Sequence, residues 1–418
     1  MVRVTDMTHG RPIRLILLFS LPLMLGSVFQ QLYTIVDTII IGRGVGMQAL
    51  ASIGAADWIN WLVLWGLQGF TQGFAILAAQ EFGAGAYDRL RRVLAMIVKL
   101  SCWFGIAVTI ISLLLVRPLL TLLHTDPAVF DGAQTYLYVQ FGGSLIIIAY
   151  NMAAAVLRCL GDSRTPLFAI IAASFANIAL DLLFVMGFGW GIFGASFATV
   201  LAQLIAFLLC LRSLRRLPFV QLTKADWKTD PAILLHLCRL GIPTGLQMSM
   251  ITLGGMVLQS VLNGFGVVFV AGYTAANKLY GILESASVAF GYAMTAYMGQ
   301  NRGARNAVRI DAGIRAVLVL SAEFTAAIVT AMLLAGKPLL GLFLSTEEAG
   351  AADALAVAYQ YLMVLMAFLF ALFMLQAYRS SLQGLGEMTV PTLSGFAEML
   401  MRMGAALVLP AFIGQSGV

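Results

Sequence analysis

The chain alternates long apolar stretches with short polar ones. Eleven of the apolar stretches reach about 20 residues or more, the length at which an α-helix crosses the hydrocarbon core of a bilayer. Glycines, prolines and clustered charges separate the stretches, as is typical of turns. We therefore expect eleven membrane-spanning helices, near residues 15–41, 50–79, 93–115, 133–157, 166–187, 190–211, 240–262, 267–299, 312–336, 355–380 and 390–412.

The composition supports this assignment. Of the 418 residues, 61% are hydrophobic and only 11% are charged, whereas typical soluble domains carry about 25% charged residues. A globular protein of this size could not bury so much apolar surface, so the sequence predicts an all-α polytopic membrane protein. The four cysteines lie in or beside apolar stretches without paired spacing, and neither a disulfide framework nor a metal site is expected.

The basic residues predict the topology. If the N-terminus is cytoplasmic, 19 lysines and arginines, Arg379 among them, fall in inner loops, and only Arg43, Arg117 and Lys337 fall in outer ones. This asymmetry follows the positive-inside rule, and a missed helix would destroy it. We expect a multi-pass protein of the plasma membrane, the inner membrane of a bacterium, with its N-terminus in the cytoplasm.

The two halves of the chain resemble each other. "LAAQEFGAGAYDR" (77–89) matches "YMGQNRGARNAVR" (297–309) at a shift of 220 residues, and "LRCLGDSRTP" (157–166) matches "LQGLGEMTVP" (382–391) at 225, after an insertion around "STEEAG". The coinciding residues include Gln80/Gln300, Gly83/Gly303, Ala84/Ala304, Arg89/Arg309, Leu160/Leu385, Gly161/Gly386 and Pro166/Pro391. Pro22 and Pro243 correspond at a similar distance.

An internal repeat of six helices predicts two lobes with the same orientation in the membrane. The expected divisions are an N-terminal lobe at 1–212, a cytoplasmic connector at 213–236 and a C-terminal lobe at 237–418. The chain ends opposite the start of the sixth helix, so we expect twelve spans in the full architecture, of which about eleven are present and the twelfth is missing.

Acidic residues inside spans are costly and by default indicate function. Asp37 lies about five residues from the outer end of the first helix, and Asn177 and Asp181 share one face of the fifth. Thr199 lies on the sixth helix. Asp37, Asp181 and Thr199 fall roughly 8–14 Å below the outer surface, as a polar site in one lobe requires. The alternative is that both acids only bond to local hydroxyl groups.

The sequence resembles the multidrug and toxic compound extrusion (MATE) transporters. The resemblance rests on "LPLMLGSVFQQLYTIVDTIIIGRGVG", on the "Q..GA" ends of the second and eighth helices and on "LRCLGDSRTP". It implies two six-helix lobes around a central cleft, and export of amphiphilic, often cationic, organic compounds in exchange for H⁺ or Na⁺. The wider superfamily also holds lipid-linked oligosaccharide flippases, which are the alternative function.

The resemblance also implies a cation site. The DinF-like branch uses an Asp, an Asn, an Asp and a Thr at positions that match Asp37, Asn177, Asp181 and Thr199, whereas the predicted seventh and tenth helices lack the acids of the NorM-like branch. These oxygens could hold Na⁺, or the buried carboxylates could carry a proton. From the branch resemblance we favour H⁺.

Further residues complete the expectation. Pro22 lacks a backbone N–H and could let the first helix bend, and Tyr33, Gln30, Glu284 and Lys278 are candidates to line the cleft. No catalytic motif or nucleotide-binding loop is found, so we expect a transporter and not an enzyme. It should act as a monomer in the lipid bilayer on small amphiphilic organic substrates, without cofactor or nucleic acid.

Other charges in or near the spans receive weaker assignments. The i,i+4 spacing of Glu398 and Arg402 predicts an ion pair within one helix. Asp57 is expected to cap the second helix near the outer surface, and no partner is assigned to Lys99.

Overall fold

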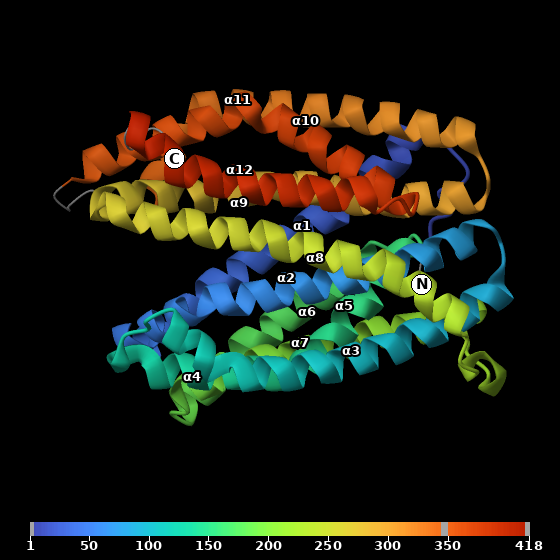
Figure 1. Ribbon diagram of the computed structural model, residues 1–418, viewed down its shortest axis with the longest axis horizontal. Coiled ribbons are helices and arrows are strands. Elements are labelled where there is room, and N and C mark those ends of the chain that lie inside the picture. Colours follow the sequence, from blue (N-terminus) through green and yellow to red (C-terminus); the bar gives the residue numbers. More distant parts are fainter. Residues whose placement is uncertain (1–3, 344–349, 414–418) are drawn as a thin grey trace.

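The computed structural model describes residues 4–343 and 350–413 and contains no β-strand within them. Long helices run side by side along the molecule (Figure 1). The α-helices are α1 (Pro12–Gly44), α2 (Met47–Gly83), α3 (Tyr87–Leu122), α4 (Pro127–Gly142), α5 (Ser144–Cys159), α6 (Arg164–Asp181), α7 (Gly191–Arg215), α8 (Pro231–Leu262), α9 (Val267–Gly303), α10 (Ala307–Gly341), α11 (Ala351–Gly384) and α12 (Thr389–Ile413). Most of the insertion around "STEEAG" lies outside the described residues.

The all-helical membrane architecture predicted from the sequence is confirmed. In the described part of the chain, nine helices are long and apolar enough to cross a membrane, or ten if α4 and α5 form one bent span. The bend between α4 and α5 is 50°. At this break, a Cβ on Gly143 would lie 2.5 Å from the Val200 side chain on α7. Glycine therefore lets α7 pack against the bend.

The long helix α9 does not meet the same hydropathy criterion, although it occupies the position of the predicted eighth span. Its sequence includes Asn277, Lys278 and Glu284. These polar side chains lower its mean hydropathy, whereas Ala276 and Leu279 of the same helix are buried against neighbouring helices.

Two hydrophobic cores organise the helices. The first core joins residues of α2, α3, α5 and α7, and the second core joins residues of α9, α10 and α11. The start of α1 contributes Ile16 and Phe19 to the second core, whereas the start of α8 contributes Ile233 and Leu237 to the first. The first helix of each half therefore packs into the core of the opposite half, in the segment that precedes Pro22 or Pro243.

The halves meet at the end of the bundle that carries the N-terminus, the α2–α3, α5–α6, α9–α10 and α11–α12 turns and the α7–α8 connector, here called the basic end. A Cβ on Gly83 would lie 2.0 Å from the backbone oxygen of Gln300, and one on Gly303 would lie 1.9 Å from that of Gln80. Only glycine permits this approach. The repeated glycines thus allow the backbones of α2 and α9 to touch.

The repeated glutamines also join the halves. Gln80 donates from Nε2 to the Gly384 carbonyl at 3.1 Å, and Gln300 donates to the Cys159 carbonyl at 3.0 Å. Gly384 and Cys159 are themselves related by the repeat at the 225-residue shift. Each half therefore hydrogen-bonds to the corresponding helix end of the other half.

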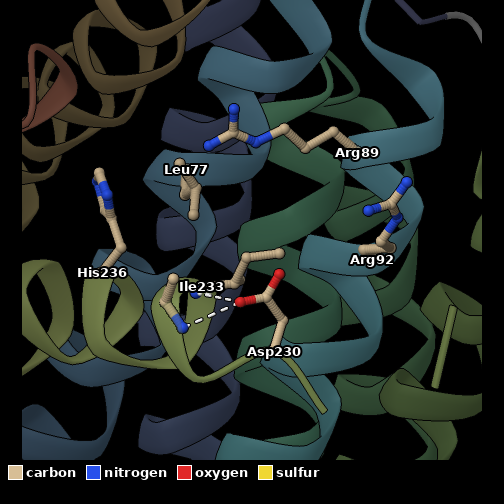
Figure 2. A pocket seen from close by; sticks show the side chains of 7 residues that line it. Leu77, Arg89, Arg92, Asp230, Ile233 and His236 are labelled. Carbon is tan, nitrogen blue, oxygen red and sulfur yellow. Dashed lines mark hydrogen bonds between the residues drawn. The ribbon is translucent and has the colours of Figure 1, made fainter. Parts of the chain in front are cut away.

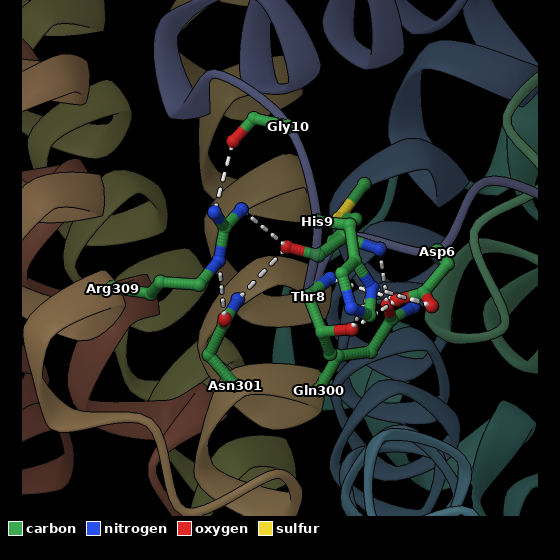
Figure 3. A network of polar contacts seen from close by, with 8 residues as sticks. Asp6, Thr8, His9, Gly10, Gln300, Asn301 and Arg309 are labelled. Atoms are coloured by element: carbon green, nitrogen blue, oxygen red, sulfur yellow. Dashed lines mark hydrogen bonds and ion pairs between the residues drawn. The ribbon is translucent and has the colours of Figure 1, made fainter.

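The N-terminal segment lies across this contact (Figure 3). Met7 is fully buried; its N–H donates to Gln300 Oε1 at 2.8 Å, and its carbonyl accepts from Arg309 Nη2 at 2.9 Å. The Thr5 N–H donates to the Gly161 carbonyl in the first half at 3.0 Å. The segment therefore bonds to both halves and reinforces the closed basic end.

Candidate functional site

Three helices of the first half carry the predicted site. Asp37 lies on α1, Asn177 and Asp181 on α6, and Thr199 on α7. A small hydrophobic cluster holds these helices together through Ile40 and Ile41 of α1, Val185, which follows α6, and Ala195 of α7, with Val36 and Ile178 packed against it. Val36 adjoins Asp37 and Ile178 adjoins Asn177 in sequence, so this apolar packing brings together the helix segments that carry the polar residues.

Asp37 and Asp181 lie close enough for their carboxyl groups to interact directly. Asp181 is 0% exposed, and among the described residues neither of its carboxyl oxygens has a hydrogen-bond partner of good geometry. One oxygen of Asp37 is likewise buried and unpartnered. Two such groups are costly in a membrane interior unless a proton or another cation is shared between them.

Asn177 strengthens this conclusion. It is 1% exposed, and both its amide oxygen and its amide nitrogen lack a hydrogen-bond partner in the described part of the chain. Buried polar atoms are normally hydrogen-bonded, so a cluster of unpartnered ones indicates a place built for a ligand. Oxygen atoms from Asp37, Asn177 and Asp181 suit a hard cation or a proton equally well.

Thr199 forms its hydrogen bond within its own helix. Its hydroxyl donates to the Ala195 carbonyl on its own helix at 3.2 Å, which leaves lone pairs available. The structure gives no bond from Thr199 to either carboxylate among the described residues. Its role in the site stays a prediction.

The backbone changes character directly after Asp181. Residues Leu182–Gly187 form a π-helix, with the Phe188 N–H bonded to the Leu183 carbonyl at 2.9 Å. Single π-turns are rare and occur frequently at functional sites. Phe184 within this turn stacks on Trp190 at 5.0 Å between ring centroids. The turn places an aromatic cluster next to the buried carboxylate.

Asp57 and Tyr136 lie near the site although the sequence did not single them out for it. Asp57 was expected to cap α2, but α2 begins at Met47, and Asp57 lies well inside the helix, within electrostatic range of Asp37. Tyr136 of α4 lies within electrostatic range of Asp57 and Asp37. Its hydroxyl accepts a hydrogen bond from Asn60 Nδ2 at 3.2 Å. The expectation for Asp57 is wrong because α2 runs without a break from Met47 to Gly83, so that no helix end lies at Asp57 for it to cap. Asn60, a second polar residue three positions after Asp57 in the same apolar stretch, could have indicated a polar face of this helix.

The candidate cleft residues differ in their surroundings. Tyr33 lies within electrostatic range of Asp37 and Asp181, one turn along α1 from Asp37, and Gln30 is exposed on the same helix. Lys278 is exposed on α9, and Glu284 is half-buried near Tyr280. Pro22 is half-buried within α1, which continues through it. Tyr33 alone among these joins the carboxylate pair.

The second half holds a separate charged cluster. Glu398 accepts from Arg402 Nη2 at 2.7 Å, as the i,i+4 spacing predicts, and also from Arg379 Nη2 at 3.0 Å. Arg379 was counted among the loop residues, but the structure places it inside α11, where it is 6% exposed. Its carboxylate partner explains how a guanidinium is tolerated there.

Glu398→Gln should destabilise the protein, because the buried Arg379 would lose the charge that compensates it. We expect a loss of roughly 3 kcal/mol in the free energy of unfolding, in line with broken buried pairs. Thermal unfolding of the purified protein in one lipid or detergent measures it. Glu323→Gln, on an exposed face of α10, is the matched control and should leave the midpoint unchanged. Equal midpoints for the two variants would contradict this role.

Lys99 has a structural partner. Its ammonium donates to the Trp227 carbonyl and to the Thr229 hydroxyl, the latter at 2.9 Å, in the connector between the halves. Lys99 therefore anchors the connector to α3. No group of three or more metal-ligating His, Cys, Asp or Glu side chains occurs in the described ranges.

The comparisons with known proteins agree with this architecture. The family model described as MatE matches residues 22–183 and 243–408. A probable multidrug resistance protein, YpnP of Bacillus subtilis, is 33% identical over 368 residues, covering 86% of this chain and 80% of its own length. The two matched segments correspond to the two halves of the internal repeat.

Solved structures share the fold. A transporter of the MOP superfamily from Pyrococcus furiosus superposes with a TM-score of 0.90 at 24% identity, covering 99% of this chain and 93% of that one. A multidrug resistance MATE family transporter in an outward-facing conformation gives 0.89 at 24% identity, with the same coverage.

Proposed function

Since this chain belongs to the MatE family of multidrug efflux transporters, we propose that it is a secondary antiporter. It exports amphiphilic, often cationic, organic compounds in exchange for a cation. The observation that carries the proposal is the pair Asp37 and Asp181, whose buried oxygens lack hydrogen-bond partners of good geometry within residues 4–343 and 350–413. A carboxylate pair of this kind must bind a positive charge, and that charge can then be coupled to transport.

The coupling ion is proposed to be H⁺. Two carboxyl groups close together can share one proton, because both cannot remain ionised in a low-dielectric site. Na⁺ is the other candidate, with Asp37, Asn177, Asp181 and Thr199 as its oxygen ligands. The described residues fit either ion, and the choice of H⁺ rests on the likeness to the DinF-like branch.

The proposed transport cycle is alternating access. The two halves contact at the basic end through Gly83 and Gly303, which supports a state closed on that side. Filling the carboxylate pair would change the charge on α1, and Pro22 would let that helix bend. We place the N-terminus and the basic end in the bacterial cytoplasm, in accordance with the distribution of arginines.

The flippase alternative gains no comparable support. An anionic lipid-linked sugar would need cationic side chains along its route. Lys99 bonds to the connector, and both Arg402 and the buried Arg379 bond to Glu398. These three cations therefore have partners of their own, which leaves Lys278 as a candidate.

Transport in proteoliposomes tests the proposal. The protein is reconstituted with a fluorescent organic cation such as ethidium, and either a H⁺ or a Na⁺ gradient is imposed. We expect movement of the cation against its own gradient with H⁺ and none above empty liposomes with Na⁺. Driving by Na⁺ alone would reassign the ion. No transport under either gradient, with correctly folded protein, would overturn the antiporter proposal for this substrate class.

A further inference from the structure

A pocket of about 380 Å³ opens at the basic end, between the starts of α3 and α8. Arg89 and Arg92 line it from α3, Leu77 from α2, and Ile233 and His236 from α8, with Asp230 at the α8 N-cap. Figure 2 shows Arg92 and His236 on opposite sides of the pocket, with the Arg89 guanidinium reaching between them. Nothing in the carboxylate site uses these residues.

The charge in this pocket is unbalanced. The one acid that lines it, Asp230, is committed to capping α8: its Oδ1 accepts from the Ala232 and Ile233 N–H groups at 3.0 and 3.2 Å. Arg89 pairs with Glu81 at 3.0 Å. Arg92 makes no ion pair within 4.0 Å in the part of the chain that the structure describes, although Asp226, which pairs with Arg91, lies within electrostatic range of it. The Arg92 guanidinium has no direct ionic contact among the described residues and can therefore bind an anion.

Neighbouring residues add to the positive field. Arg239 of α8 and Arg302 of α9 both lie within electrostatic range of His236, as does Arg89. Like charges that gather on one surface repel one another, and an anion between them relieves that repulsion. The cationic groups come from α3, in the first half, and from α8 and α9, in the second.

The remaining wall is apolar. Leu77 and Ile233 are buried members of the first core. The pocket thus presents guanidinium groups beside a hydrophobic surface, at the helix ends that we place at the membrane–water interface. Lipid phosphates lie at this depth, and basic pockets between helices on one side of a membrane are typical sites for anionic headgroups.

We propose that this pocket binds a phosphate group, held by Arg92 and Arg89 with His236 opposite. Guanidinium pairs with phosphate through two parallel hydrogen bonds, which makes arginine the residue suited to this ligand. The phosphate belongs either to an anionic phospholipid or to a soluble phosphate compound. Because the ligand would contact α3 and α8 together, its binding favours the arrangement in which the halves meet at the basic end.

The test compares variants of the full chain in nanodiscs. Arg92→Gln removes the unpaired guanidinium, Arg92→Lys keeps the charge but loses the paired donors, and Arg215→Gln is the control, exposed at the same end but outside the pocket. Each is placed in phosphatidylcholine discs, with added phosphatidylglycerol in one arm and added inorganic phosphate in the other. The midpoint of thermal unfolding reports binding, because a ligand of the folded state raises it.

We expect one of the two probes to raise the midpoint of the native chain and of Arg215→Gln. In Arg92→Gln the apparent affinity for that probe should fall about tenfold, the usual loss for one charge-assisted contact, with Arg92→Lys between. A shift with phosphatidylglycerol alone identifies a lipid, and a shift with inorganic phosphate identifies a soluble source. Equal responses of Arg92→Gln and Arg215→Gln, or no response of the native chain, would overturn the proposal.

A second readout covers the case in which Arg92→Gln does not fold. Native mass spectrometry of the native chain, released from mixed discs, should retain phosphatidylglycerol in preference to phosphatidylcholine, and Arg92→Lys should retain less. The site would be contradicted if the native chain retained both lipids equally and if inorganic phosphate also left its unfolding midpoint unchanged. Neither readout depends on transport, so a failed antiporter proposal and a failed phosphate site can be told apart.

Discussion

Asp37→Asn should reduce cation-driven export to the rate of empty liposomes, and Asp181→Asn should do the same. Asparagine keeps the shape of aspartate but carries neither a negative charge nor an exchangeable acidic proton. The remaining carboxylate could still bind a cation, but the pair could no longer share one between α1 and α6. The measurement is uptake of the organic cation in proteoliposomes under the gradient that drives the native protein.

Stability separates this role from a structural one. Each variant removes one of two neighbouring acids, the half-buried Asp37 or the buried Asp181, so thermal unfolding should occur at or above the native midpoint. Asp131→Asn, on an exposed part of α4, is the matched control and should transport normally. Export that survives in both Asp37→Asn and Asp181→Asn would contradict the coupling assignment. A lowered midpoint with lost export would instead indicate that the acids hold the fold.

Gly303→Ala should prevent the close contact of the two halves. The added methyl group would lie 1.9 Å from the Gln80 carbonyl, a rigid backbone atom in α2. The helices must separate, and the bond from Gln80 to Gly384 would be strained with them. We expect a loss of more than about 2 kcal/mol in the free energy of unfolding, at the scale of overpacking in a dense interior, together with loss of export.

Gly404→Ala provides the same chemical change without the clash, because no atom of the described residues lies within 4 Å of the Cβ it would add. Alanine favours a helix interior over glycine by about 0.5–1 kcal/mol, so this control should be neutral or slightly stabilising. Gly83→Ala, the repeat partner, should behave like Gly303→Ala. If Gly303→Ala and Gly404→Ala unfold alike, the α2–α9 contact does not limit stability.

The membrane fold could be predicted from the sequence because its cause is local. A bilayer requires every span to be long and apolar, and each predicted stretch corresponds to a helix or helix pair in the described residues. The structure extended most of them; α2, for example, runs over Met47–Gly83 where 50–79 was expected. The polar first and last turns were missed because they lie beyond the apolar stretch.

The candidate site was only partly predictable. Asp37 and Asp181 could be identified because an ionised acid in an apolar span is energetically costly and therefore indicates a function. Asp57 and Tyr136 could not, since one lay near a predicted helix end and the other is an ordinary residue in a span. Arg379 was misassigned for a similar reason: an arginine near a predicted helix end was counted as a loop residue, although its partner Glu398 is distant in sequence and holds it inside.

The sequence by itself determined that the chain spans a membrane, that it repeats, and that two acids break its apolar helices. Hydropathy and repetition are read along the chain, so they need no knowledge of contacts. Only the tertiary structure decided that Asp37 and Asp181 meet, and that the starts of α1 and α8 pack into opposite cores. It also showed that the repeated Gln80 and Gln300 join the two halves, because each forms a hydrogen bond to the other half. Such pairings depend on which surfaces are complementary in space, and this cannot be read from the order of residues. Gly83 and Gly303, for example, matter because the backbones of α2 and α9 touch at these two positions.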